Sequence, residues 1–291
     1  MNDQATTLRR MSALTINLGE PEPVRQVRTI AIASGKGGVG KTNIAVNVAI
    51  ELAALGRKVS LLDADLSLAN ADVILGLNPK YHLGHVLTGQ KELEDVVITL
   101  ANGLRLIPGG SGVEQLANLP IEAHTRYVNE LNAIEADSDY FIVDSAAGIA
   151  GNVTGVLRAA TEIIVVTTPE PTAMVDAYAT IKVAHQYSPN KLIWVVINNA
   201  NGVGYAQQAF KQLFTAAQRF LPHNINYLGT IPHDEVLADA VRERSPVVEF
   251  APNAPSSRSL RLIARALDRS AEGNNLSSSS SFWEVLTESE V

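Results

Sequence analysis

The stretch that decides the fold is SGKGGVGKTN, residues 34–43. The apolar run RTIAIAS at 28–34 leads into it, and the pattern NIAVNVAIELAALG, which closes on Gly56, follows it. A β-branched run, a glycine-rich turn and a helical period predict a strand, a tight loop and a helix. In this context the pattern G-x-x-x-x-G-K-[ST] predicts a phosphate-binding loop, with a purely structural glycine loop as the weaker alternative.

The residue types in this loop match what a phosphate chain needs. Glycines allow successive backbone N–H groups to converge on phosphate oxygens, and the helix N-terminus adds its dipole. We expect Lys41 to reach the terminal phosphates and the Thr42 hydroxyl to bind Mg²⁺. The predicted nucleotide-binding residues of the loop are Gly35, Lys36, Gly37, Gly38, Val39, Gly40, Lys41, Thr42 and Asn43.

The rest of the chain alternates short apolar runs with longer amphipathic stretches. Several of the runs are almost continuous in Val, Ile and Leu, as is typical of parallel strands covered on both faces. With right-handed crossovers, this alternation predicts an α/β fold with a doubly wound, mostly parallel sheet and helices on both faces. The predicted strands are 28–34, 58–65, 104–110, 140–146, 162–168, 192–198 and 225–232.

Composition narrows the class of protein. The chain has 291 residues, a formal charge of −7 and no cysteine, which excludes disulfides, thiolate zinc sites and iron–sulfur clusters. It has no apolar run long enough for a membrane span and no signal-peptide pattern, so we expect a cytoplasmic protein. We predict an N-terminal partner-binding segment and linker at 1–26, a nucleotide-binding domain at 27–269, and a serine-rich linker with a short tail at 270–291.

The second lysine of the loop is the unusual feature. The sequence K-G-G-V-G-K-T, which starts at Lys36, resembles the deviant phosphate loop of the MinD/ParA class of ATPases. The resemblance implies ATP and Mg²⁺ as cofactors and a homodimer in the ATP-bound state. It also implies that Lys36 crosses the dimer interface and, together with Lys41, stabilises charge on the transferred phosphoryl group. A solvated loop lysine is the alternative.

Three carboxylates follow two of the predicted strands. Asp63 and Asp65 lie two apart in LLDADLSLANAD, and Asp144 ends the apolar run in YFIVDSAAGI. Asp144 matches a Walker B aspartate, which binds Mg²⁺ through water. The resemblance implies that Asp65 orients the attacking water and that Asp63 lies near the metal. The alternative for either residue is a cap on the following helix.

The base pocket is expected from resemblance alone. In this family an asparagine at the end of a late strand contacts adenine, and it is best matched by Asn198, with Asn199 as the alternative. The segment GTIPHDEVL matches a family segment in which the backbone near Pro232 packs on the base and Asp234 caps the next helix. Ordinary strand-end turns with an N-cap are the competing interpretation.

The N-terminus points to one branch of the class. NDQATTLRRM resembles the D-Q-A-x-x-L-R motif of the flagellar number regulators FlhG/FleN, in which it docks on the signal-recognition-type GTPase FlhF. The resemblance implies regulation of flagellar number or placement through such a GTPase, a flagellar transcription activator, or both. The predicted partner-binding residues are Asp3, Gln4, Leu8 and Arg9.

The C-terminus departs from that pattern. Flagellar regulators often end in a basic amphipathic helix that binds lipid, whereas FWEVLTESEV is acidic and has no Lys or Arg. The sequence leaves open whether Phe282 and Trp283 contact a membrane or lie in a disordered tail, and hence whether the protein sits at the membrane or cell pole. The acidic charge argues against direct DNA binding. A ParA- or MinD-type ATPase that patterns on nucleoid DNA or membrane is the alternative function.

Overall fold

The computed structural model describes most of the chain between residue 27 and residue 287. Side chains of residues 121–126 and 152 are not described. The predicted partner-binding residues Asp3, Gln4, Leu8 and Arg9 lie outside the described part. The described residues are 27–65, 70–110, 112–113, 121–187, 191–221, 225–270 and 281–287.

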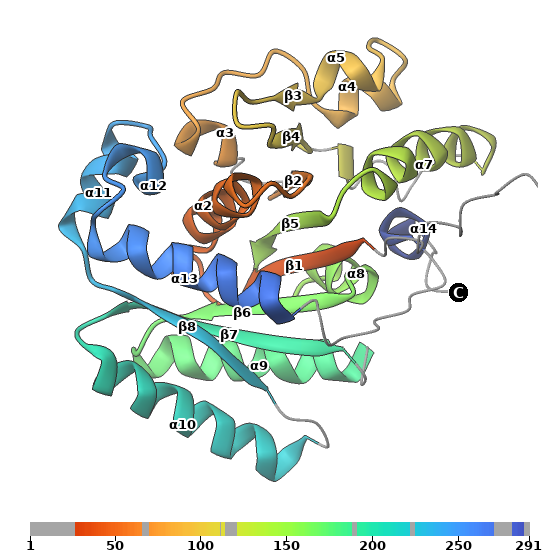
Figure 1. The fold of residues 1–291 in the computed structure, drawn as a ribbon. Coiled ribbons are helices and arrows are strands. Elements are labelled where there is room, and N and C mark those ends of the chain that lie inside the picture. Colours follow the sequence, from red (N-terminus) through yellow and green to blue (C-terminus); the bar gives the residue numbers. More distant parts are fainter. Residues whose placement is uncertain are drawn as a thin grey trace, which may run out of the picture.

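The described strands form one eight-stranded sheet with the order β3-β4-β2-β5-β1-β6-β7-β8 (Figure 1). All neighbouring strands are parallel except β3 and β4, which pair antiparallel at one edge. The strands are β1 (Arg28–Ser34), β2 (Val59–Ala64), β3 (Ile98–Thr99), β4 (Arg105–Pro108), β5 (Tyr140–Ala147), β6 (Glu162–Thr167), β7 (Leu192–Ala200) and β8 (Asn226–Pro232).

Helices cover both faces of the sheet. The first strand shows why two layers are needed, since every residue of β1 is buried and alternate residues point to opposite faces. The helices are α2 (Lys41–Ala54), α3 (Ala71–Ile74), α4 (Leu83–Leu87), α5 (Leu93–Val96), α7 (Ile121–Ala136), α8 (Gly151–Ala159), α9 (Pro171–Tyr187), α10 (Val203–Phe220), α11 (Glu235–Arg242), α12 (Val247–Phe250), α13 (Pro255–Ser270) and α14 (Phe282–Thr287).

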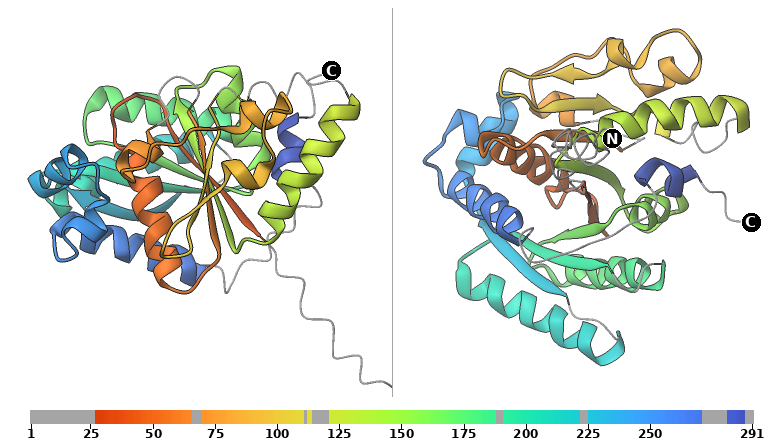
Figure 2. Two further views of the ribbon diagram at one scale, coloured as in Figure 1. Left: turned by 90° about the horizontal axis from the view of Figure 1, so that it is seen from above. Right: turned by 45° about the vertical axis from the view of Figure 1, so that its right-hand side comes forward.

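Figure 2 shows helices on both sides of the sheet, and a hydrophobic core lies beneath the helices on each side. Ile30 and Ile32 of β1 join the core under α2 and α13, whereas Ala31 and Ala33 join the core under α7, α8, α9, α10 and α14. The strand order reverses at β1, which lies between β5 and β6. In an open α/β sheet, ligands bind beyond the carboxyl ends of the strands at such a reversal, and here the glycine-rich loop occupies that position.

The predicted doubly wound sheet is confirmed. Each of the seven predicted strands is present, with ends that differ by two residues at most. The antiparallel strand β3 is an addition that the sequence did not reveal, because its two residues are too few to show a period.

The C-terminal tail is the main departure from expectation. Helix α14 packs against α7 and α8, and its Phe282 and Trp283 side chains are buried in the core beneath them. Both rings contact Phe141 of β5, with centroid distances of 5.6 and 5.7 Å. The described tail is therefore part of the folded domain, and its aromatic face is turned away from solvent. Among the described residues, no helix has both the length and the apolarity to cross a membrane.

Candidate functional site

The glycine-rich loop joins β1 to α2 at the carboxyl edge of the sheet. Gly38 and Gly40 have φ angles of +78° and +90°, which favour glycine, and α2 begins at Lys41 directly after them. At Gly35 a Cβ atom would lie 2.2 Å from the backbone oxygen of Asp176 in α9. The glycines are thus required by the turn and by close packing, and the loop presents its backbone at a helix N-terminus.

Lys41 and Asp144 form a buried ion pair at the centre of the site. The Lys41 ammonium lies 2.6 Å from Oδ1 of Asp144, and the exposed fractions of the two side chains are 7% and 0%. Burial raises the pKa of the Asp144 carboxyl, while the ammonium and the nearby Thr42 hydroxyl act in the opposite direction. Oδ2 of Asp144 is buried and has no hydrogen-bond partner in the described part of the chain.

Asp63 lies beside this pair because β2 and β5 are neighbours, with Asp63 in register with Asp144. Its Oδ1 accepts the Asp65 N–H at 3.2 Å, and its Oδ2 accepts the N–H groups of Asn70 and Ala71 at 3.1 and 3.0 Å. Burial, followed by the Asp144 charge, raises the pKa of Asp63 to about 7. Oδ2 thus binds N–H groups at the start of α3, as the capping alternative expects, while Oδ1 binds the chain just after β2. A position of Asp63 near the metal stays a prediction.

Asp65 ends the described segment that follows β2. It is two residues beyond Asp63, and the backbone hydrogen bond between them fixes the direction in which the chain leaves the sheet. Residues 66–69, which follow Asp65, lie outside the described part, and the description resumes at Asn70. The role of Asp65 toward water stays a prediction.

Lys36 points away from the centre of its own loop. Its ammonium lies 3.1 Å from the Glu170 carboxylate and 3.3 Å from the Thr172 hydroxyl, both near the start of α9. The exposed fraction of its side chain is 42%, against 7% for Lys41. One loop therefore carries a buried lysine inside the site and a solvent-exposed lysine at its rim.

The predicted base-pocket residues lie next to the loop, on β7 and β8. The Asn198 amide donates to the Val39 carbonyl at 2.7 Å, so this side chain braces the loop. Asn199 has a φ of +55°, and its Oδ1 lies 2.7 Å from Nδ1 of the exposed His233. Pro232 pairs with the end of β7. Adenine contact by any of these residues stays a prediction.

Asp234 is the N-cap of α11, as the sequence predicts. Its Oδ1 accepts the Val236 N–H at 3.1 Å. Its Oδ2 accepts the backbone N–H and the hydroxyl of Ser256 at 2.9 and 2.6 Å. These bonds lower the pKa of Asp234 although burial acts against them, and they tie the start of α11 to α13.

The donor set fits a nucleotide with a divalent cation. The loop supplies backbone N–H groups and one buried cation, which match the charge of a phosphate chain. The unpartnered Oδ2 of Asp144 beside the Thr42 hydroxyl is an oxygen site of the kind that Mg²⁺ prefers. In the described residues, no group of three His, Cys, Asp or Glu side chains forms a metal site by itself. A cation would therefore need phosphate oxygens or water as further ligands.

Comparison with protein-family models identifies the class. A model described as "ParA: NUBPL iron-transfer P-loop NTPase" matches residues 25–268. The chain belongs to the MinD/ParA family of P-loop ATPases. The predicted family and the predicted ATPase activity are thereby confirmed.

Several curated MinD/ParA proteins resemble the chain over most of its length. It is 40% identical over 242 residues to the antiactivator FleN of Pseudomonas aeruginosa, covering 83% of this chain and 86% of FleN. It is 36% identical over 274 residues to the flagellum site-determining protein YlxH of Helicobacter pylori, covering 92% and 90%. This MinD/ParA ATPase is thus FleN/FlhG-like in sequence.

Solved MinD structures share the fold. MinD in the MinC:MinD cell division complex of Aquifex aeolicus superposes with a TM-score of 0.69 at 27% identity, covering 88% of this chain and all of that one. MinD of Pyrococcus horikoshii, solved in complex with Mg-ADP, gives a TM-score of 0.67 at 25% identity, covering 84% and 98%. This MinD/ParA ATPase therefore has the same overall fold as these MinD proteins.

Three residues at the site of this MinD/ParA ATPase escaped the sequence analysis. Glu170 and Thr172 hold Lys36, and Asp176 packs its backbone against Gly35. All three residues belong to the segment PEPTAMVD, which follows the β6 run at the same edge of the sheet as the loop. Its polar residues carry no motif, so only the strand order reveals that it faces the loop.

Proposed function

We propose that the protein is an ATP-dependent dimerising switch that regulates flagellar number or placement. It would be monomeric when empty or bound to ADP, and a face-to-face homodimer when bound to ATP and Mg²⁺. Hydrolysis to ADP and phosphate would return it to the monomer. We place this activity in the cytoplasm.

The position of Lys36 is the observation that supports this proposal most. A second cation that served the chain's own phosphates would be expected inside the site with Lys41. Lys36 instead lies at the rim, 42% exposed, on a carboxylate that is 64% exposed. An exposed ion pair of this kind contributes little stability, so Lys36 can leave Glu170 at small cost. A lysine held loosely at a rim is suited to reach a phosphate in a facing protomer.

Each site residue then has a separate task. Lys41 binds the terminal phosphates, and its present contact with Asp144 would be exchanged for them. Thr42 and Asp144 would hold Mg²⁺, which supplies charge neutralisation between the phosphates when bound. Asp65 would orient the attacking water, while Asp63 fixes the backbone that carries Asp65. Lys36 of the facing protomer would stabilise the charge that develops on the transferred group.

The flagellar assignment is supported by the relatives. FleN is an antiactivator and YlxH determines a flagellum site, and both cover most of the chain. We infer that an FlhF-type GTPase, a flagellar transcription activator, or both are partners, with the GTPase engaged through Asp3, Gln4, Leu8 and Arg9. The name of the matching family model mentions iron transfer, but the chain has no cysteine thiolate to hold a cluster.

Deleting residues 3–9 tests the GTPase partner. Dimerisation and ATP hydrolysis should be unchanged, whereas stimulation of GTP turnover by an FlhF-type GTPase should be lost. Gln4→Ala should reduce stimulation more than binding, because a residue that orients water acts in the transition state. Leu8→Ala should weaken binding by about 1–3 kcal/mol if the leucine is buried in the complex. Equal stimulation by the truncated and full-length chains would reject this partner.

The biological role needs a test in cells. The chain can be expressed in a Pseudomonas aeruginosa strain that lacks FleN, its relative at 40% identity. We expect the number of flagella per cell, counted by electron microscopy, to move toward that of the parent strain. The same chain with Lys41→Ala is the control and should have no effect. Failure of the unaltered chain to change the count would favour the ParA/MinD-type alternative.

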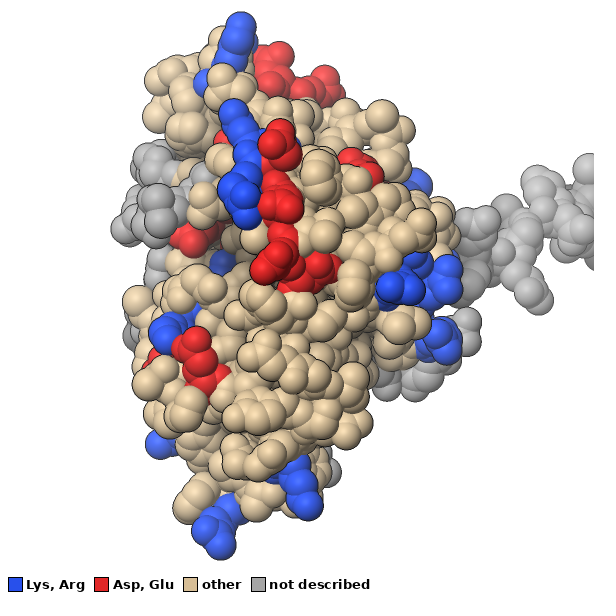
Figure 3. Space-filling model, turned by 90° about the vertical axis from the view of Figure 1, so that its left-hand side faces the viewer, with Lys and Arg blue, Asp and Glu red and all other residues tan. Residues whose placement is uncertain are grey.

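That alternative needs a basic or lipid-binding surface. On the face that carries α11, acidic and basic groups lie side by side and do not merge into one basic area (Figure 3). Arg242, for example, lies 2.8 Å from Asp239. The aromatic residues of α14, which could have met a lipid surface, are buried. Neither the face drawn in Figure 3 nor the aromatic residues of α14 therefore support a nucleoid or membrane surface, and we propose a protein partner instead.

A further inference from the structure

A stripe of arginines lies on the outer side of α13. Figures 1 and 2 show this helix, in blue, on the outside of the molecule, and it packs on α2 and β8. Arg258, Leu262, Arg265 and Arg269 are exposed and recur at intervals of four, three and four residues, which puts them on one side of the helix. Leu262 is 61% exposed. These four residues are called the basic stripe below.

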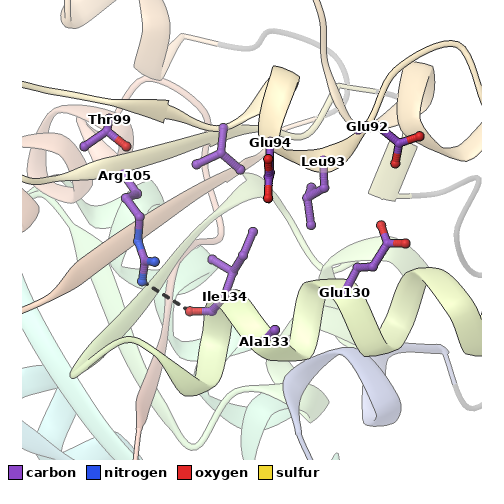
Figure 4. A pocket seen from close by; sticks show the side chains of 9 residues that line it. Glu92, Leu93, Glu94, Thr99, Arg105, Glu130, Ala133 and Ile134 are labelled. Carbon is purple, nitrogen blue, oxygen red and sulfur yellow. Dashed lines mark hydrogen bonds between the residues drawn. The ribbon is translucent and has the colours of Figure 1, made fainter.

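Other arginines of the described chain have carboxylate partners. Figure 4 shows Arg105 at the cleft beside α7, where it donates to the Ile134 carbonyl, and it also lies 2.9 Å from the Asp137 carboxylate. On α13 itself, Arg261 lies 3.0 Å from Glu51. In the described part of the chain, by contrast, the three arginine side chains of the basic stripe make no hydrogen bond or ion pair.

The sequence around the basic stripe offers no carboxylate that could neutralise it. No acidic residue lies between Glu249 and Asp268. Asp268 is already engaged, since it lies 2.8 Å from the Arg57 guanidinium and accepts the Tyr140 hydroxyl at 2.8 Å. The basic stripe therefore combines three unmatched cations with an exposed leucine in a chain of formal charge −7. An acidic occupant with an apolar side chain fits it best.

The chain itself contains such a segment. Residues 18–23, LGEPEP, carry one leucine and two glutamates, and the two prolines favour an extended backbone. In the extended polyproline conformation, Glu20 and Glu22 are about 6 Å apart. Arg265 and Arg269 are also about 6 Å apart along the axis of α13. The spacing of the two carboxylates thus matches that of the two guanidinium groups.

The segment is tethered beside the end of α13. The Arg28 side chain, at the start of β1, donates to the Leu267 carbonyl and to the Ser270 hydroxyl at 3.1 Å. Glu22 lies six residues before Arg28, which spans up to about 20 Å, so it can reach the level of Arg269. Exposed ion pairs are weak one at a time, but so short a tether keeps the glutamates at high effective concentration beside the arginines.

We propose that residues 18–23 dock along the basic stripe of the same chain. The two glutamates would meet the two arginines nearest the end of α13, and the leucine would cover Leu262. The chain before them would then lead toward the start of α13, where Ser256 binds the α11 cap Asp234.

Docking would therefore determine where the N-terminal segment is presented. The residues proposed to bind a partner would lie on the α11 side of the molecule, near the end of β8, instead of at the opposite edge where β1 begins. This goes beyond the proposed switch, since the docked state needs neither nucleotide nor partner. It can be tested whether or not the switch proposal holds.

The absence of cysteine allows a direct test in the full-length chain. Asn17→Cys is combined with Ser259→Cys on α13, because residue 17 is three residues before Glu20 and Ser259 is six residues before Arg265, or about 9 Å in each case. A short bismaleimide is added to dilute protein without nucleotide, and crosslinked chain is measured on a denaturing gel.

The matched control replaces Ser259→Cys with Ala179→Cys on α9. Both positions are half-buried, and α9 covers the opposite face of the sheet next to β1. Ala179 is eight residues from the end of its helix, and Ser259 is eleven from the end of α13. We expect the α13 pair to react at least about tenfold faster, because docking raises the effective concentration of its two thiols. Equal rates would overturn the proposal.

A charge swap distinguishes docking from chance encounter. Glu20→Lys with Glu22→Lys should slow the α13 crosslink to the control rate, as should Arg265→Glu with Arg269→Glu. The four changes together should restore fast crosslinking, because opposite charges face each other again. Arg219→Glu, an exposed change on α10, should leave the rate unaltered.

Three results of these experiments would contradict intramolecular docking. The first is fast crosslinking that survives either charge reversal alone. The second is a fourfold variant that stays at the control rate. The third is a product that joins two chains, which would show that a second copy is the occupant.

Discussion

At the scale of single residues, the site depends on one buried cation. Asp144 is fully buried; its Oδ1 lies 2.6 Å from the Lys41 ammonium, and its Oδ2 has no hydrogen-bond partner in the described part of the chain. A buried carboxylate without a cation is costly, so Lys41 stabilises the fold in addition to its proposed role toward phosphate. The buried position proposed to let Lys41 bind nucleotide also makes this lysine important for structure.

We predict that Lys41→Ala abolishes nucleotide binding and lowers the free energy of unfolding by about 3–5 kcal/mol, because Asp144 stays buried without its partner. Titration with a fluorescent ADP analogue measures the first effect, and urea unfolding measures the second. Lys41→Ala with Asp144→Asn is the control and should recover part of the stability but no binding. Unchanged ADP affinity in Lys41→Ala would contradict the assignment.

Asp65→Ala should separate binding from hydrolysis. We expect ATP and Mg²⁺ affinity to be retained and single-turnover hydrolysis to slow by about 10²-fold or more, because the attacking water loses its orienting carboxylate. The protein should then accumulate as a dimer. Asp72→Ala in nearby α3 removes an equal charge and serves as the control. A normal rate in Asp65→Ala would move the catalytic role elsewhere.

The limit of sequence reasoning is also clearest at this scale. The loop from Gly35 to Thr42 was predictable because the spacing of its glycines, lysine and threonine is specific to a phosphate-binding loop. Asn198 was not, since the sequence places it at a strand end but cannot show that its amide donates to Val39. Contacts between distant segments depend on strand order, which no single segment encodes.

At the scale of elements, α14 is held by more than its aromatic rings. Glu135 of α7 accepts the Phe282 N–H at 3.0 Å and the Thr29 hydroxyl of β1 at 2.7 Å. Arg158 of α8 donates to the Val285 carbonyl at 2.9 Å. The tail helix is thus joined to both neighbouring helices and to the strand that leads into the phosphate loop.

Trp283→Ala should therefore destabilise the domain. The ring is fully buried, and truncating such a side chain costs about 3–5 kcal/mol. Urea unfolding followed by circular dichroism measures the loss. Val175→Ala, at a side chain that is 68% exposed, should cost little and serves as the control. A loss below about 1 kcal/mol would show that α14 does not stay docked in solution.

The docking of α14 should weaken as pH rises. Burial raises the pKa of the Glu135 carboxyl above its usual 4.5, so the folded chain keeps a proton that the unfolded chain has lost. The contribution of this group is complete below pH 4.5 and is lost as the pH rises through the raised pKa. Trp283 fluorescence in a Trp194→Phe background reports it during urea titration. In Glu135→Gln this pH dependence should be absent, and its persistence would contradict the role of Glu135.

At the scale of the whole molecule, the sequence predicted the central strands of the sheet far better than the edge strand β3 and the C-terminal helix α14. The central strands are buried on both faces, so their apolar runs are long and unbroken. The edge strand β3 and the tail helix α14 are too short for a period to show, and α14 is acidic in sequence although its Phe282 and Trp283 belong to the core. Their positions follow from packing against partners far away in the chain.

We propose that two chains form a dimer in which Lys36 of each chain reaches the nucleotide bound by the other. The most direct test is the molar mass in solution, by light scattering after size exclusion, with Mg²⁺ and a non-hydrolysable ATP analogue. We predict that the unaltered chain doubles its 31.1 kDa mass. Lys36→Ala should bind ADP with nearly unchanged affinity and stay at the mass of one chain. A Lys36→Ala protein that forms the dimer as readily as the unaltered chain would contradict the account.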